Sequence, residues 1–93
     1  MILKFICEDN YEAEKLSSII TLQKDGSLYV IEIVKVIENE VIVKLKDGSY
    51  HSILLKDQEN AQRLKKIFSH ISSTQNRVVS TSCVENEMFM DLR

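Results

Sequence analysis

Residues 28–55 have the sequence LYVIEIVKVIENEVIVKLKDGSYHSILL, and this stretch decides the fold. β-Branched and aromatic residues dominate it, which is typical of strands. Polar residues at Glu38–Glu40 interrupt the apolar sequence, and Asp47-Gly48 supplies the positive φ angles of a tight hairpin. The stretch therefore predicts three consecutive strands: Leu28–Ile37, which we expect to be the central one, Val41–Lys46 and Ser49–Leu55.

Both faces of the segment Leu28–Ile37 are apolar. Because side chains alternate between the faces of a strand, one face carries Tyr29, Ile31, Ile33 and Ile37, and the other carries Leu28, Val30, Val34 and Val36. One layer of helices covers only one face of a sheet. The alternation therefore predicts a second covering layer, supplied by this chain or by a second copy of it.

An N-terminal strand and a short helix precede this stretch. Residues 2–7 alternate weakly and are partly apolar on both faces, as in a strand inside a sheet. Asp9 or Asn10 can cap a helix over about residues 10–17, which has acidic residues in its first turn. Residues 17–23 suit either a continued helix or a strand that begins near residue 18, and we favour the strand.

The tetrapeptide Lys-Asp-Gly-Ser occurs twice, at residues 24–27 and 46–49. Identical turn chemistry predicts two similar hairpins. We interpret the repeated tetrapeptide as two independent uses of a common turn sequence rather than as a duplicated functional unit.

The hydrophobic period changes after Leu55. Asp57 can cap a helix, and a polar connection at Ser72–Asn76 ends it. Between them, apolar residues recur at helical spacing over about residues 58–72: Ala61, Leu64, Ile67, Phe68 and Ile71. Residues 77–84 then predict a further strand, and residues 87–93 an apolar segment that docks or pairs.

These elements predict one α+β domain over residues 1–93. We expect a mostly antiparallel sheet of four to six strands, with a meander around residues 18–55, packed by an amphipathic helix (about 58–72) and an N-terminal helix (about 10–17).

With 44% hydrophobic and 28% charged residues, the composition is that of an ordinary globular chain. No apolar run is long enough to span a membrane, and the N-terminus lacks the basic leader of a signal peptide. A cytoplasmic protein without a membrane partner is expected.

The cysteines Cys7 and Cys83 lack the C-x-x-C spacing of a zinc or redox site. We expect two small buried side chains, with a disulfide or a reactive thiol as the alternatives. A catalytic pair would have to combine one of them with His51 or His70, and neither cysteine lies in a glycine-rich turn. Neither glycine begins a phosphate-binding loop. We therefore expect no enzymatic activity, no cofactor and no metal.

Positive charge is concentrated near the second predicted helix. Residues 61–80 contain no acid and carry the candidate nucleic-acid contacts Arg63, Lys65, Lys66 and Arg77. Phosphate binding needs little more than such a surface. The net charge of -2 opposes it, so nucleic-acid binding is our second hypothesis.

The favoured hypothesis is a small non-enzymatic protein-interaction module that acts through its surface. It would regulate or inhibit a partner protein, as virus-encoded and mobile-element-encoded proteins of this size often do. Methionine and aromatic residues are enriched in interface cores, and the candidate interface residues are Met88, Phe89, Met90 and Leu92. The expected partners are a second copy, in a homodimer, and one unidentified protein. The alternative is that this segment covers the chain's own sheet.

Overall fold

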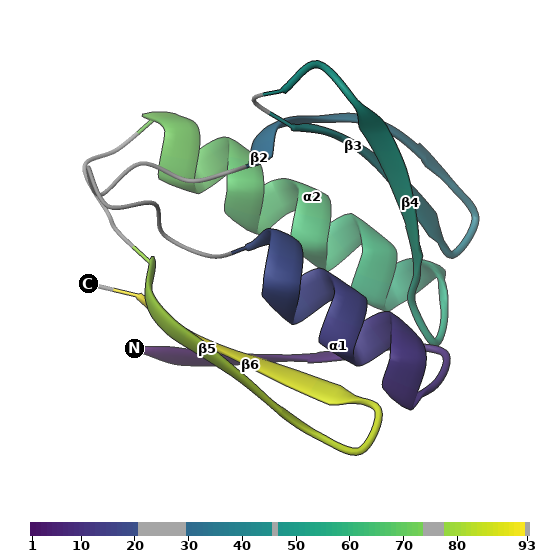
Figure 1. Ribbon diagram of the computed structural model, residues 1–93, viewed down its shortest axis with the longest axis vertical. Helices are drawn as coiled ribbons and strands as arrows, with labels where there is room; N and C mark the ends of the chain where they lie inside the picture. The colour runs from purple at the N-terminus through teal and green to yellow at the C-terminus, as the bar shows by residue number, and fades with distance from the viewer. Residues whose placement is uncertain (21–29, 46, 74–77, 93) are drawn as a thin grey trace.

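The computed structural model describes residues 1–20, 30–45, 47–73 and 78–92. It is an α+β fold whose strands form two antiparallel three-stranded sheets, in the orders β1-β6-β5 and β2-β3-β4. The two helices lie between the sheets (Figure 1). In chain order the elements are β1 (Ile2–Ile6), α1 (Asn10–Ile19), β2 (Val30–Ile37), β3 (Glu40–Leu45), β4 (Tyr50–Leu54), α2 (Gln58–Ser73), β5 (Val78–Val84) and β6 (Glu87–Leu92).

The predicted α+β class, the antiparallel pairing and both helices are confirmed. The strands form two sheets where one was expected: α1 packs mainly on one of them and α2 mainly on the other. In the described part of the chain, no helix has the length and apolar character needed to cross a membrane.

The central strand of its sheet is β3, so the prediction that residues 28–37 form the central strand is wrong. β2 lies at the edge of the sheet, and its pairing with β3 is shifted between Val30 and Glu32 and between Ile33 and Lys35. These shifts break the strict alternation of faces. Val34 and Ile37 are consequently 48% and 44% exposed, although both are apolar. Strand-like composition therefore indicated the strand but not its place in the sheet.

Helix α1 continues to Ile19, so the predicted strand is wrong at residues 18 and 19. Asp9 caps the helix by accepting a hydrogen bond from the Glu12 N–H at 2.9 Å. At the other end the Ile20 N–H donates to the Leu16 carbonyl at 3.0 Å. Leu16, Ile19 and Ile20 are buried, and this apolar stripe outweighs their strand propensity. Residues 21–29, with the first Lys-Asp-Gly-Ser sequence, lie outside the described residues.

Helix α2 forms as predicted and begins after the cap Asp57. The Asp57 carboxylate accepts hydrogen bonds from the backbone N–H and the side-chain amide of Asn60, both at 2.9 Å. These bonds favour the ionised carboxylate and lower the pKa of Asp57. Ala61, Leu64 and Phe68 are buried in the core.

The two halves of the chain, residues 1–47 and 48–93, contain the same elements in the same order: strand, helix and hairpin. Equivalent residues lie 48 positions apart in the strand and helix and 47 positions apart in the hairpin. Both hairpins turn at Glu-Asn-Glu, and Glu38 and Glu85 have φ angles of 54° and 56°. The equivalent and identical core pairs are Ala13 with Ala61, Leu16 with Leu64, and Leu45 with Leu92.

An approximate two-fold axis relates the halves. Cys7 pairs with its own equivalent, Leu55, in an antiparallel bridge between the two sheets. The hydrogen bonds around the bridge are reciprocal: the Glu8 N–H donates to the Leu54 carbonyl at 3.0 Å, and the Lys56 N–H donates to the Ile6 carbonyl at 2.9 Å. An antiparallel pair of equivalent residues places the axis between them.

Two asparagines clamp this bridge. The Cys7 N–H donates to the Asn86 carbonyl at 2.8 Å, and the Asn86 side-chain amide donates to the Cys7 carbonyl at 3.1 Å. The Leu55 N–H donates to the Asn39 carbonyl at 2.8 Å, and the Asn39 amide donates to the Leu55 carbonyl at 2.9 Å. Each hairpin turn therefore holds the end of a strand from the other half.

The helices also pack across the halves. α1 packs mainly on β5 and β6, whereas α2 packs mainly on β2 and β3. One polar side chain on each helix also bonds to a strand of the other half. Glu12 accepts a hydrogen bond from the Leu54 N–H, and Asn60 accepts one from the Ile6 N–H, both at 3.0 Å. Each sheet and its covering helix therefore draw residues from both halves.

The two-fold arrangement predicts equal costs for equivalent core truncations. Leu16 and Leu64 are 1% and 0% exposed, so Leu16→Ala and Leu64→Ala should each destabilise by about 2 to 5 kcal/mol. The two values should agree within about 1 kcal/mol, and denaturant midpoints measure both. The exposed Gln62→Ala is the control, expected within about 0.5 kcal/mol of wild type. A Leu64→Ala variant as stable as the control would contradict this packing.

Candidate functional site

The structure places the predicted interface residues mostly inside the chain. They belong to β6, the middle strand of its sheet. Met88 and Met90 are fully buried and Leu92 is 3% exposed, all within the hydrophobic core. Phe89 points to the opposite face and is partly exposed. Of the four residues, Phe89 is therefore the one with a side chain open to a partner.

The sheet faces that point away from the helices carry further apolar residues. Buried residues alternate along β3 and β6, so Glu40, Ile42 and Lys44, like Glu87, Phe89 and Asp91, lie on the outer faces. Partners in register share a face. Glu87 lies between Val84 and Ile6, and Glu40 lies between Ile37 and Leu54. We call Ile6, Ile37, Leu54 and Val84 the outer stripe.

The outer stripe crosses the two-fold axis. Cys7 and Leu55 point inward at the bridge, so their neighbours Ile6 and Leu54 point outward, on either side of the axis. Each is half-buried. At the two ends of the stripe, Val84 is 60% and Ile37 is 44% exposed. The stripe thus consists of two equivalent apolar pairs, Ile6 with Val84 and Leu54 with Ile37, and one glutamate lies between the members of each pair.

Charged residues lie both within the outer stripe and beside it. Glu87 and Glu40 form one row, level with the stripe. Lys4 and Lys35 form a second row, beside Phe89 and Ile42 respectively. The Glu and Lys rows are two residues apart along the strands. At these two levels each sheet carries one glutamate and one lysine, but Lys4 corresponds to Ser52 rather than to Lys35, and at the next level Asp91 corresponds to Lys44.

The second candidate surface is the exposed side of α2. Arg63, Lys65 and Lys66 are all exposed, and Gln62, Lys65, Lys66 and Ser69 line a shallow hollow. The Arg63 guanidinium also stacks over the Phe5 ring, 5.1 Å from its centre. Arg77, the fourth predicted contact, lies outside the described residues. Three of the four predicted cations are thus brought onto one helix.

The equivalent positions of α1 have a different charge. Lys15 corresponds to Arg63, but Ser17 and Ser18 correspond to Lys65 and Lys66. A matching shallow hollow on α1 is lined by Tyr11, Glu14, Lys15 and Ser18. The two-fold relation therefore holds in the core and along the outer stripe but not in the charge of the helices.

The two cysteines, Cys7 and Cys83, are not joined in a disulfide. Both are free thiols; Cys7 is buried, and Cys83 donates a hydrogen bond to the Ala13 carbonyl at 3.2 Å. Burial, followed by the nearby Cys83, Glu12 and Asp9, raises the pKa of the Cys7 thiol to about 12. The thiolate form required for nucleophilic attack is thus disfavoured. Among the residues that the structure describes, no three metal-ligating side chains gather in one place.

Sequence analysis missed the outer stripe. Its residues belong to four different strands, and no local pattern joins them. One signal was available: Ile37-Glu38-Asn39-Glu40 and Val84-Glu85-Asn86-Glu87 are nearly identical and 47 residues apart. The repeated Lys-Asp-Gly-Ser sequence, 22 residues apart, has a different spacing and is not part of this duplication.

Comparisons of this chain with protein-family models, with curated proteins and with solved structures found no match. The functional proposals therefore rest on the chain's own residues and geometry.

The raised pKa of Cys7 predicts a loss of stability at high pH. An unperturbed thiol titrates near 9.0, whereas Cys7 in the fold titrates at about 12. Between these values the unfolded chain releases the proton and the folded chain keeps it, so stability falls as pH rises. The extra slope approaches about 1.4 kcal/mol per pH unit. Denaturant titrations of wild type and Cys7→Ala between pH 8 and 11 should show a steeper decline in wild type, and parallel curves would contradict the assignment.

Proposed function

We propose that the protein is a non-enzymatic interaction module that pairs with a second copy of itself through the outer stripe. The dimer acts by binding, as a regulator or inhibitor of a partner protein, and its helices remain exposed for that contact. The observation that supports this proposal is the uncovered apolar surface of Ile6, Ile37, Leu54 and Val84 on the side of the sheets away from the helices.

A second copy suits this surface because its apolar residues are equivalent, Ile6 to Leu54 and Ile37 to Val84. Dimers with two-fold symmetry use the same patch on both subunits, and such a patch must be complementary to itself. The Glu and Lys rows place opposite charges on the same outer faces, so Lys4 and Lys35 of one copy would oppose Glu40 and Glu87 of the other. Phe89 and Ile42, which pair with Lys4 and Lys35 in the second row, would add apolar contacts at equivalent places.

The proposal predicts a dimer that charge at the ends of the outer stripe disrupts. Wild type should be dimeric by light scattering within roughly 1 to 100 µM, whereas Val84→Lys combined with Ile37→Lys should be monomeric. Each substitution occurs twice in a symmetric interface. The two changes together should raise the dimer Kd by roughly two orders of magnitude or more, because an unpaired charge costs on the order of 1 to 3 kcal/mol.

The control adds the same two positive charges at exposed positions of a helix, with Gln58→Lys and Gln62→Lys. This variant should remain dimeric. Circular dichroism and the denaturant midpoint should show that both variants stay folded, because Val84 and Ile37 are exposed at strand ends. A wild-type chain that is monomeric over the whole concentration range would overturn the proposal.

The basic side of α2 supports a second candidate function, weak binding of nucleic acid. The observation in its favour is the difference in charge between the helices: α2 has Lys65 and Lys66 at the positions where α1 has two serines. Binding of this kind would depend on phosphate contacts and would fall steeply with salt. The acidic residues elsewhere give the chain its net charge of -2 and oppose such binding.

A matched pair of charge reversals tests this second function. Arg63→Glu and Lys15→Glu make the same charge change at equivalent positions of α2 and α1. If α2 binds phosphate, Arg63→Glu should weaken the polarisation signal with duplex DNA or structured RNA far more than Lys15→Glu. Each lost phosphate contact should reduce the salt slope on duplex DNA by about 0.9. Equal effects of the two variants, or no binding by wild type at moderate salt, would exclude α2 as the contact.

A further inference from the structure

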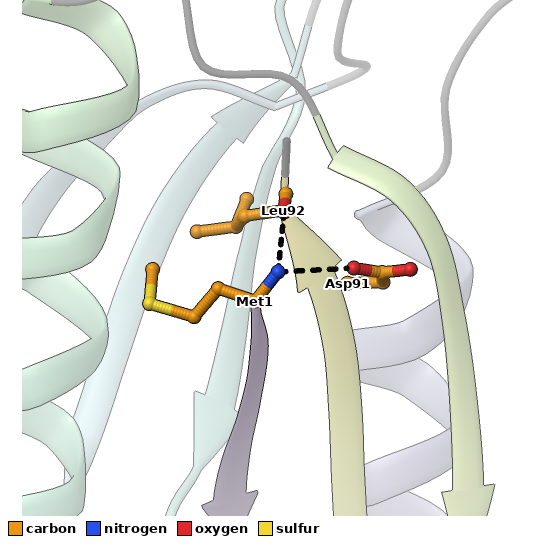
Figure 2. Close-up of polar contacts among 3 residues, drawn as sticks. All are labelled: Met1, Asp91 and Leu92. Carbon is orange, nitrogen blue, oxygen red and sulfur yellow. Dashed lines mark hydrogen bonds and ion pairs between the residues drawn. The ribbon is translucent and has the colours of Figure 1, made fainter.

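The junction between the chain ends matches the turn between the halves. In the turn, the Leu45 N–H donates to the Ser49 carbonyl at 2.9 Å. At the ends, the equivalent Leu92 N–H donates to the Met1 carbonyl at 2.7 Å. Figure 2 shows the Met1 amine directed at the Leu92 carbonyl, 2.8 Å away, and at the Asp91 carboxylate, 3.5 Å away. The two strands are therefore connected by covalent bonds at the turn, and by hydrogen bonds and an ion pair at the chain ends.

The contacts that hold the fold together run between the halves. β1 pairs with β6 and β4 pairs with β3, so both sheets depend on strands from both halves. α1 and α2 each cover the hairpin of the other half. The asparagine clamps of Asn39 and Asn86 also act across the halves. A half on its own would have an uncovered hairpin and an unpaired strand.

The covalent connection between the halves contributes little to these contacts. It is the exposed turn around Asp47 and Gly48. Gly48 has a φ of 86°, and an added Cβ would meet no atom within 4 Å. The turn is stabilised locally, by the Asp47 carboxylate accepting the Ser49 N–H at 2.9 Å. Cutting it would remove no described contact between a helix and a sheet.

We infer that the chain is a covalent dimer: residues 1–47 and 48–93 are two copies of one self-associating unit of strand, helix and hairpin. The strand and helix of each unit form a surface that fits the hairpin of another copy. This interface lies inside the chain, on the helix-facing sides of the sheets. It is therefore separate from the outer stripe and does not rest on the proposed function.

Cleavage of the folded full chain tests this inference. A recognition site for a specific protease is inserted between Asp47 and Gly48, in the Val84→Lys and Ile37→Lys background, so that pairing through the outer stripe cannot join the fragments. After cleavage, the two fragments should co-elute as a one-to-one complex by size exclusion with light scattering. Thermal unfolding should become concentration-dependent, and Tm should drop by several degrees for each tenfold dilution. The uncut chain is the control, and its Tm should not change with dilution.

A circular permutant provides an independent measurement. Arg93 and Met1 correspond to Lys46 and Ser49, so inserting Asp-Gly between Arg93 and Met1 gives the end junction a turn of the same length as residues 46–49. The permutant begins at Gly48 and ends at Asp47, and it should unfold cooperatively with a Tm close to that of wild type. A second permutant, opened between Glu38 and Asn39, cuts the hairpin turn that clamps Leu55 and should be much less stable. Fragments that separate after cleavage, or a first permutant no more stable than the second, would overturn the inference.

Discussion

The reciprocal bridge between Cys7 and Leu55 is the contact on which the rest of the structure depends. It is short, but the clamps from Asn86 and Asn39 give each bridging residue hydrogen bonds at both its N–H and its carbonyl. These groups are buried with their side chains, and buried backbone groups must be paired. Because the bridge joins the two sheets at the axis, it sets which faces the helices cover. The sides that remain uncovered, with Ile6 and Leu54 at their centre, follow from that geometry.

The duplication separates positions that support the fold from positions that differ between the halves. Alanine and leucine occupy equivalent core positions of the two helices, and aspartate caps both. Glu12 and Asn60 differ chemically but accept the same kind of backbone hydrogen bond. The exposed helix residues follow no such rule, and positive charge gathers on α2 alone. A partner that binds the helices would therefore meet two different surfaces, whereas a partner that binds the outer stripe would meet one surface twice.

Much of the local structure could be predicted from the sequence, because local signals decided it. The cap at Asp57, the stripe of Ala61, Leu64 and Phe68, and the turn at Asp47-Gly48 are each encoded within a few residues. The placement of the strands could not be predicted in the same way. Position in a sheet depends on pairing with distant residues, such as β1 with β6, and composition carries no information about those partners.

The candidate site was predictable only in part, for the same reason. Phe89 was identified from its residue type, but Met88 and Met90, chosen on the same grounds, face the core. Which side of a strand faces the core is fixed by the helix that covers it, here a helix from the other half of the chain. The outer stripe joins residues from β1, β2, β4 and β5 around an axis that becomes visible only when Cys7 is seen to pair with Leu55.

The pairing of β1 with β6 has a consequence for how the protein is made. Strand β1 pairs with β6, and the pair of Ile2 with Asp91 joins two residues that are far apart in the sequence. Contacts this distant in sequence slow folding, because chain entropy is lost before they form. On the ribosome, β1 and α1 emerge long before the hairpin on which they pack. Until residues 78–92 have been synthesised, β1 lacks its pairing partner and α1 lacks the hairpin on which it packs, and in that interval aggregation or capture by a chaperone would compete with folding.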